Sequence, residues 1–306
     1  EPNRPSAYHF NREQIWDGLT LGSEVICNGL LRDWVNWQRD PEQKQHNSRF
    51  SLLRRVLKTL SPPDLPEGIT PGKYPTRIPD RGVLDIPTIE LPYGTVPVTQ
   101  ASAGIQRIMA LAYLLVWAWS EHLEKCKMQR QDPAERLLLL VDEVEAHLHP
   151  KWQQTILPAV LGLVSDLQPK TTGKKTLPGM QTQVLACTHS PLVLASVEPI
   201  FDEEQDRLFS FETKGPKVWV EAKPWAKQGD IINWLVSDMF DMKGGRSREA
   251  NQAIEAADAL MRGDDMSQFP GHLRSLNDID KALHSLLAGH DSYWPLWVVG
   301  QRKSDK

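Results

Sequence analysis

The stretch LLLLVDEVEAHLHP, residues 137–150, decides how the rest of the chain is interpreted. Five apolar residues are followed by two acids, Asp142 and Glu143, and then by two histidines that flank a leucine. A continuous apolar run of this length predicts a β-strand with both faces buried, as in the centre of a parallel sheet. Ligands of α/β folds bind outside the carboxyl ends of such strands, so the two acids lie where a ligand is expected.

An aspartate followed by a glutamate at a strand end suits phosphate chemistry. Asp142 can hold a magnesium ion, usually through water, because magnesium keeps part of its hydration shell. Glu143 points the other way and can polarise a water molecule for in-line attack on a γ-phosphate. The same two residues are also compatible with an exposed acidic turn that follows a core strand.

Two other stretches place polar groups at the ends of apolar elements. ASAGIQR, residues 101–107, precedes a long apolar segment, and a serine and a glycine at a helix start offer a hydroxyl and free N–H groups to an anion. In ACTHSP, residues 186–191, a second apolar strand ends at His189, which can donate a hydrogen bond to a phosphate oxygen. Taken alone, each stretch also has a structural explanation, as a helix cap formed by Ser102 and as a satisfied structural histidine.

Composition narrows the class of protein. The 306 residues, 40% of them hydrophobic and with a formal net charge of −4, suffice for one large domain or for one domain with an appended lobe. The longest apolar run, residues 108–119, suits a buried helix rather than a membrane span, and no signal peptide is visible, so we expect a cytoplasmic protein and no membrane partner. Cys27, Cys126 and Cys187 have no paired spacing and are interpreted as reduced thiols. The chain starts at Glu1 rather than at a methionine, and we expect it to be part of a longer protein.

Changes of composition along the chain divide it into three parts. We expect a helical subdomain, a proline-rich loop and an edge hairpin in residues 1–100, an α/β core in 101–227, and a helical lobe in 228–306. Within the first part, residues 23–37 have the periodicity of an amphipathic helix. Within the core, a buried helix is expected over 103–126.

The order and spacing of these features resemble the second half of an ABC-type ATPase. The variants DExExHLHP and THSP are similar to the branch that contains the SMC, RecF and overcoming-lysogenization-defect ATPases. Residues 228–250 and 290–299 resemble C-terminal segments of bacterial anti-phage ATPases of the Septu-type and retron-associated kinds. The matching motifs are the signature Ser102-Ala103-Gly104, the Walker B pair Asp142–Glu143, the D-loop Glu145–His149 and the switch histidine His189.

The resemblance implies a fold, a site and cofactors. The fold is α/β, the C-terminal part of a P-loop NTPase (ABC ATPase) core, with a helical subdomain and a helical C-terminal lobe. The cofactors are ATP and Mg²⁺. The implied residues are Glu143 and His189 as catalytic, Ser102, Gly104, Asp142 and His147 as nucleotide-binding, and Asp142 as the metal ligand.

The pair of histidines in His147-Leu148-His149 has two interpretations. By resemblance, these residues lie in the D-loop, which crosses the dimer interface, so we expect packing and hydrogen bonding there. A His-x-His pair can also bind zinc, but no third or fourth ligand lies at a usable spacing nearby.

A P-loop pattern, G-x-x-x-x-G-K-[ST], is missing from the sequence. In EGITPGKY, residues 67–74, the glycines are one residue too close, and a tyrosine follows the lysine. In QPKTTGKKT, residues 168–176, a glutamine occupies the first glycine position, and the segment follows the Walker B strand, which is the wrong order. We therefore expect the P-loop to come from outside this segment.

The resemblance also implies a function. We expect an ATP-binding and hydrolysing subunit that forms a homodimer, or a higher even oligomer, around ATP and gates an effector nuclease or toxin, or DNA engagement, in anti-phage defence. One alternative is a RecF-like DNA repair ATPase that clamps DNA itself. Another is a non-hydrolysing scaffold for dimerisation or effector docking.

Overall fold

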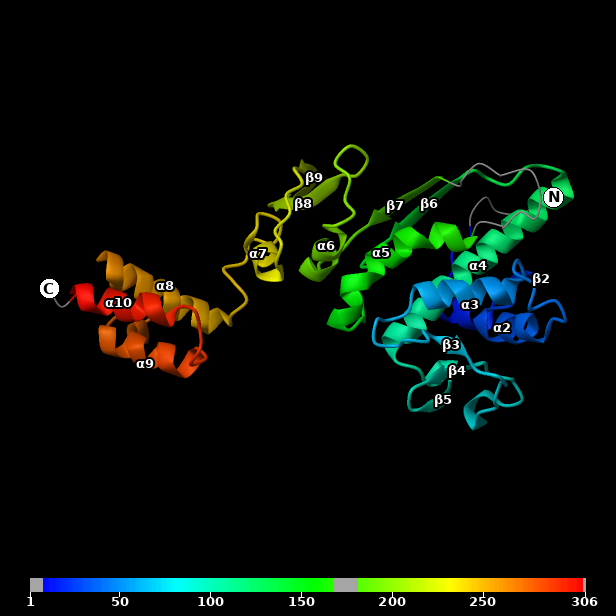
Figure 1. Ribbon diagram of the computed structural model, residues 1–306, viewed down its shortest axis with the longest axis horizontal. Helices are drawn as coiled ribbons and strands as arrows, with labels where there is room; N and C mark the ends of the chain where they lie inside the picture. The colour runs from blue at the N-terminus through cyan, green and yellow to red at the C-terminus, as the bar shows by residue number, and fades with distance from the viewer. Residues whose placement is uncertain (1–7, 168–180, 305–306) are drawn as a thin grey trace. The chain divides into compact units, whose positions relative to one another are not determined.

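The computed structural model describes residues 8–167 and 181–304, which fall into two compact units, residues 1–202 and 203–306 (Figure 1). The second P-loop candidate, residues 168–176, lies outside the described residues. Each unit has its own cluster of buried apolar side chains, so each is described separately.

The first unit mixes helices with short strands and one pair of longer strands. Its helices and strands, in chain order, are α1 (Arg12–Asp17), β1 (Leu19–Leu21), β2 (Glu24–Cys27), α2 (Leu30–Arg39), α3 (Arg49–Thr59), β3 (Thr70–Pro71), β4 (Thr88–Leu91), β5 (Gly94–Pro97), α4 (Ala103–Gln129), β6 (Arg136–Val141), α5 (Pro150–Leu167), β7 (Gln181–Ala186) and α6 (Pro191–Val197). Single 3₁₀ turns occupy Pro79–Arg81 and Val98–Gln100.

Helix α4 is the axis of this unit, and the expected buried helix over 103–126 is confirmed. Its buried residues recur three and four positions apart, which places them on one face of the helix. Helix α3 packs against both α4 and α5, and all three helices contribute side chains to the same core (Figure 1). The helix ends where Arg130 adopts a left-handed conformation and its N–H bonds to the Cys126 and Lys127 carbonyl oxygens.

Strands β6 and β7 form a parallel pair in which Val141 lies opposite Ala186, so both strands end at the same edge. Their inner side chains pack against the core, among them Leu139 and Val184. The outer face is different, because Leu138 and Leu140 are 56% and 68% exposed. The prediction that both faces of this strand are buried is therefore wrong for the residues that the structure describes.

The N-terminal part of the chain departs from its periodicity. Residues 23–37 were expected to form one amphipathic helix, but Glu24–Cys27 pairs with Leu19–Leu21 as an antiparallel hairpin. The helix begins only at Leu30, after Gly29 adopts a φ of 84°. A Cβ at Gly29 would lie 2.3 Å from the Gly18 nitrogen, so the close approach of these two turns requires glycine and interrupts the helix.

The first P-loop candidate, residues 67–74, is part of an antiparallel sheet. Strand β3 pairs with β4, and β4 pairs with β5, which confirms the expected edge hairpin. Residues 72–78 continue without helical structure, whereas a P-loop leads into a helix. The rejection of this segment as a P-loop agrees with its fold.

The second unit consists of an antiparallel hairpin and helices. Its helices and strands are β8 (Leu208–Lys214), β9 (Lys217–Lys223), α7 (Ile231–Val236), α8 (Arg248–Arg262), α9 (Leu276–Leu286) and α10 (Trp294–Ser304), with 3₁₀ turns at Met266–Gln268 and Gly271–Leu273. Alanines of α8 pack against Ile279, Leu283 and Trp297, and the indole of Trp297 donates to Asp280 at 2.8 Å.

The two compact units and the three predicted parts have different boundaries. In the sequence, the boundary between the two units follows Asp202, whereas the predicted boundaries follow residues 100 and 227. The core of the first unit continues across residue 100, because side chains of α2 and α3 pack with those of α4. Among the residues described, no helix is both long and apolar enough to cross a membrane.

Candidate functional site

Three segments meet at the carboxyl edge of the β6–β7 pair. They are the loop that follows β6, residues 142–149, the turn that follows β7, residues 187–190, and the first two turns of α4. We call residues 142–149 the central loop, because both of the other segments bond to it. The predicted site residues thus come from three places in the sequence and lie on segments in direct contact.

The start of α4 packs tightly against the central loop. Ser102 caps the helix, and its hydroxyl accepts the Ile105 N–H at 3.4 Å. Gly104 is buried, and a Cβ atom there would lie 2.7 Å from the His147 carbonyl oxygen. Only glycine permits this approach of helix and loop. The geometry gives Gly104 a packing role, and its contact with a phosphate stays a prediction.

Arg107, one turn further along α4, holds the beginning of the central loop. Its Nη2 atom donates to the carbonyl oxygens of Asp142 and Glu143, at 2.9 and 2.8 Å. Because these bonds go to backbone atoms, they fix the path of the chain and leave both carboxylates available. The guanidinium also places a positive charge beside the two acids.

Glu145 joins the central loop to the turn after β7. One carboxylate oxygen accepts the Thr188 hydroxyl at 2.6 Å, and the other accepts the His189 N–H at 2.7 Å. Bonds to a carboxylate are among the stronger ones in proteins. The backbone of His189, the predicted switch histidine, is therefore bonded directly to the central loop.

A second link connects the same two segments through α5. The Ser190 hydroxyl donates to Gln153 at 2.7 Å, and the Gln153 amide donates to the Leu148 carbonyl oxygen at 2.9 Å. Ser190 also caps α6, where its hydroxyl accepts the Leu192 N–H. The turn after β7 is thus held on both sides.

The backbone of the central loop is strained at two of the predicted site residues. Glu143 has a φ of 46° and His147 a φ of 64°, which are left-handed values uncommon for residues other than glycine. The Arg107 bond and the close contact of Gly104 hold these two residues from the α4 side. Strain of this kind concentrates at functional sites, where the surrounding structure maintains it.

The side chains predicted to meet nucleotide are accessible. Asp142, Glu143, His147 and His189 are all exposed, while Val144 and Leu148 anchor the loop in the core. The structure gives the carboxylates of Asp142 and Glu143 no hydrogen-bond or ion-pair partner within its described ranges.

A magnesium ion fits this donor set. It takes one or two protein carboxylates and completes its octahedron with water and phosphate oxygens, and Asp142 offers such a carboxylate. No group of three or more histidine, cysteine or acidic side chains in the described part of the chain has the arrangement of a metal site.

The Nδ1 atom of His149 accepts the Lys151 N–H at 3.3 Å, so this histidine helps to begin α5.

Arg107 and Glu145 are the residues that the sequence did not single out. Both lie inside motifs that were recognised, Arg107 three residues after Gly104 and Glu145 at the start of the D-loop. The sequence signal that could have identified them is a charged residue close to a motif of small or acidic residues. Their partners are 35 to 44 positions away, which no local pattern reports.

A parallel strand pair that ends in Asp-Glu and Thr-His, with a capped helix start against it, is the arrangement expected of the Walker B half of a P-loop NTPase core. Comparison with known proteins supports this class. Residues 73–195, which include every predicted site residue, match the family described as "AAA domain, putative AbiEii toxin, Type IV TA system".

The predicted resemblance to retron-associated ATPases is confirmed by two relatives. The chain is 25% identical over 216 residues to the retron Ec83 probable ATPase of Escherichia coli, covering 70% of this chain and 33% of that protein. It is 40% identical over 60 residues to the retron Vc95 probable ATPase of Vibrio cholerae serotype O1 biovar El Tor, covering 20% of this chain and 9% of that protein. The chain thus spans about a third or less of the length of these relatives.

Proposed function

We propose that this chain is the Walker B half of an ATP-binding and hydrolysing subunit that dimerises around ATP and gates an effector, or DNA engagement, in anti-phage defence. The observation that carries the proposal is the central loop, which is bonded on one side to α4 and on the other to the turn after β7. The central loop therefore connects α4 with the turn after β7 through direct contacts on each side.

Each exposed side chain has a chemical role in this proposal. Asp142 holds magnesium, which when bound neutralises charge on phosphate oxygens. Glu143 orients a water molecule and takes up its proton as the water attacks the γ-phosphate. His189 donates a hydrogen bond from its ring to a phosphate oxygen, and its backbone N–H remains committed to Glu145.

A P-loop from outside this segment completes the nucleotide site. The outer face of the β6–β7 pair supports this part of the proposal, because Leu138, Leu140 and Leu185 are 56%, 68% and 48% exposed on neighbouring strands. Exposed aliphatic side chains in a parallel sheet indicate a missing layer, since parallel sheets are covered on both faces. We assign that layer to the strand and helix that carry the P-loop.

Ser102 contributes to the nucleotide site of a second subunit. The exposed residues at the start of α4 are Ser102 and Ala103, and the N-terminal end of a long helix attracts anions. The dimer closes when Ser102 of one subunit meets the γ-phosphate held by the other. The closed dimer then activates the effector. The retron relatives are named as probable ATPases, which agrees with the hydrolysis step alone.

Replacing Glu143 by glutamine tests the proposed reaction. Glu143→Gln keeps the shape of the side chain and the bonds of its backbone but removes the base. In the assembly that supplies the P-loop, turnover should fall by roughly 100-fold or more while ATP binding persists. Turnover is measured by phosphate release, and binding by equilibrium titration with ATP.

Two further measurements make this test decisive. The purified 306-residue chain alone should not hydrolyse ATP, because no sequence in it cradles the α- and β-phosphates. Asp142-dependent hydrolysis by the chain alone would overturn the external P-loop. Undiminished turnover of Glu143→Gln in the complete assembly would remove Glu143 from the reaction, and a lack of any turnover in the parent assembly would favour the non-hydrolysing scaffold.

A further inference from the structure

A basic hollow lies in the first unit, away from the central loop. It has a volume of about 440 Å³ and is formed by α3, the loop that precedes this helix, and the segment that leads into β3. Its lining contains five basic side chains and one acidic one, Glu67. The basic side chains are Lys44, His46, Arg54, Arg55 and Lys58.

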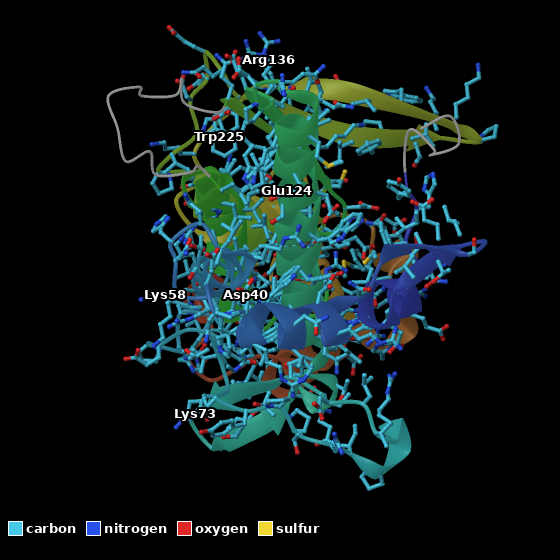
Figure 2. The ribbon with its side chains drawn as sticks, turned by 90° about the vertical axis from the view of Figure 1, so that its right-hand side faces the viewer. Asp40, Lys58, Lys73, Glu124, Arg136 and Trp225 are labelled. Carbon is cyan, nitrogen blue, oxygen red and sulfur yellow. The ribbon has the colours of Figure 1, made fainter. Side chains whose placement is uncertain are left out.

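The cations of α3 share one face of the helix. Ser51, Arg54, Arg55 and Lys58 follow the three- and four-residue spacing of a single face, and apolar residues on the other face enter the core. Lys58 and Arg54 are exposed, and Figure 2 shows Lys58 on the outer side of this helix. The helix therefore presents a positive stripe to the surface.

Internal pairing does not explain the charges of Arg54 and Lys58. Arg54 and Lys58 are four positions apart, and like charges at this spacing destabilise a helix by about 0.2–0.5 kcal/mol. Lys44, Arg54 and Lys58 have no acidic partner in the described part of the chain. Arg55 instead donates to the His46 carbonyl oxygen at 2.7 Å, which fixes the loop that carries Lys44 and His46. With a net charge of −4 for the chain, this positive surface is a local feature.

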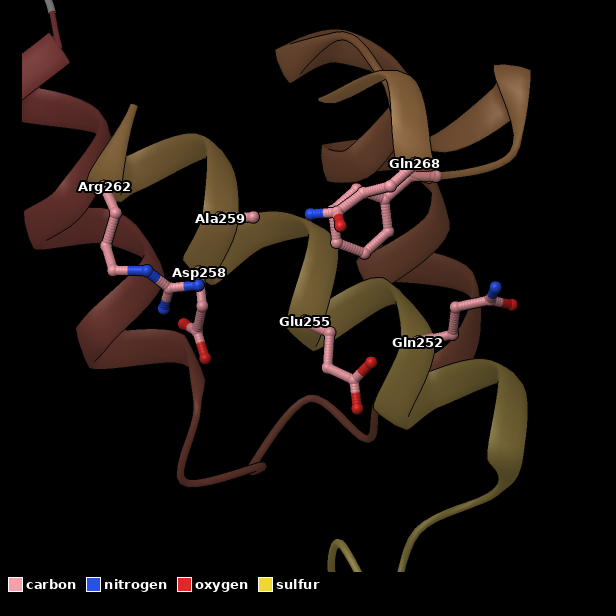
Figure 3. Close-up of a pocket in the computed structure, with 7 residues that line it drawn as sticks. Gln252, Glu255, Asp258, Ala259, Arg262 and Gln268 are labelled. Atoms are coloured by element: carbon pink, nitrogen blue, oxygen red, sulfur yellow. The ribbon is translucent and has the colours of Figure 1, made fainter. Parts of the chain in front are cut away.

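A second hollow, on α8, differs in this respect (Figure 3). Asp258 accepts the Tyr293 hydroxyl at 2.6 Å, and Glu255 pairs with Lys243. Arg262 pairs with Asp264 at 2.9 Å. Its charged side chains are thus all paired within the unit, in contrast to those of the basic hollow.

We propose that the basic hollow binds the phosphate backbone of a nucleic acid, without reading its sequence. Arginine and lysine side chains are the usual phosphate contacts of such proteins. The lining has no phenylalanine, tyrosine or tryptophan on which a base could stack, and the imidazole of its one histidine, His46, bonds to Asn47. Contact with the phosphate backbone is therefore favoured over sequence readout. The lining also lacks an exposed apolar centre, because Ile69 is 1% exposed, whereas protein interfaces have apolar cores.

Charge reversal on the exposed face of α3 tests this surface. The complete protein is titrated, without nucleotide, against short fluorescein-labelled DNA duplexes and single strands, and fluorescence anisotropy is recorded. The double variant Arg54→Glu/Lys58→Glu should bind at least about tenfold more weakly than the parent protein. Omitting ATP separates this test from the proposed hydrolysis, so either proposal can fail alone.

A matched variant controls for net charge. Lys125→Glu/Lys127→Glu makes the same change of charge at two exposed positions of α4 and should bind as the parent does. Equal weakening by both double variants would show that only net charge matters and would overturn the proposed surface. Circular dichroism and the unfolding midpoint verify that each variant is folded.

The salt dependence provides a second readout in a milder variant. Arg54→Ala/Lys58→Ala removes two cations, and the slope of log K against log salt should become shallower by about 1.8 for duplex or about 1.4 for single strands. An unchanged slope would overturn the proposal. So would displacement of the nucleic acid by polyglutamate of equal charge at equal concentration, which would assign the surface to an acidic protein.

Discussion

Helix α4 makes two sets of polar contacts that differ in what they leave exposed. In its first two turns, Gly104 and Arg107 contact backbone atoms of the central loop, and the acidic side chains of that loop stay accessible. In its middle, the Tyr113 hydroxyl donates to Asp33 at 2.8 Å and lies 2.9 Å from the Cys27 sulfur, and all three side chains are buried.

The difference separates groups that hold the fold from groups that remain free for chemistry. The buried set is closed, because Asp33 also accepts from Asn28 at 2.9 Å and each side chain has a partner. At the helix start, the contacts of α4 with the central loop involve only backbone atoms of that loop. The carboxylates of Asp142 and Glu143 therefore stay available to ligands. Substitutions in the two sets should therefore have different consequences.

The largest effect on stability is expected at Gly104. Gly104→Ala places a methyl group 2.7 Å from the His147 carbonyl oxygen, and this neighbour is backbone, which moves at a cost. The free energy of unfolding should fall by about 2–3 kcal/mol, as in other overpacked sites. Urea titration followed by tryptophan fluorescence measures the change.

Gly162→Ala is the matched control. Gly162 lies inside α5, and within the described residues a Cβ atom there would meet nothing outside the helix backbone within 4 Å. The same substitution should stabilise the protein by about 0.5–1 kcal/mol, because alanine favours helices. Equal effects at the two glycines would refute the tight contact between α4 and the central loop.

A smaller effect is expected in the buried set. Tyr113→Phe removes the hydroxyl that bonds to Asp33 and should lower the free energy of unfolding by about 1–2 kcal/mol. Tyr93→Phe is the control, because Tyr93 is 78% exposed and should be nearly neutral. A neutral Tyr113→Phe would mean that the hydroxyl contributes nothing to stability.

The same residues predict a dependence on pH. Burial, above all, raises the pKa of Tyr113 and also that of Cys27 from their ordinary values of 10.0 and 9.0. The unfolded chain then ionises first, so stability is fully present below about pH 9 and falls as pH rises. Above pH 10, Tyr113→Phe should lose stability less steeply than the parent protein, and parallel curves would contradict this origin.

The smallest effect on stability is expected at Glu145, with a larger one on turnover. Glu145→Gln keeps one acceptor but weakens the bonds to Thr188 and His189, and should cost about 1 kcal/mol. Turnover in the complete assembly should fall several-fold, because His189 loses its fixed position. Glu124→Gln, on the exposed side of α4 (Figure 2), should change neither quantity. Unchanged turnover of Glu145→Gln would remove this bridge from the mechanism.

Sequence patterns predicted the elements that carry the candidate site. The apolar runs before Asp142 and His189 are strands, and Ser102 caps the long helix, because these features depend on neighbouring residues alone. The roles of the site residues stay predictions. The close approach of Gly104 to His147 was not predictable, since it depends on tertiary packing.

Two errors have a common cause. Residues 23–37 have helical periodicity, yet the contact between Gly18 and Gly29 favours a hairpin followed by a shorter helix. The run before Asp142 is apolar on both sides, yet its outer side is exposed in the described structure. In the first segment the surrounding structure decides the conformation, and in the second it decides the burial of one face, and local composition reports neither.

The cysteines give the exposed face of the β6–β7 pair a chemical reporter. Cys187 directly follows β7 and is exposed, whereas Cys27 and Cys126 are buried. A maleimide dye should therefore modify the native protein at one position, beside the strand edge. The rate of that alkylation reports whether the face is covered. It should fall when another layer of polypeptide covers the sheet and rise again when that layer dissociates.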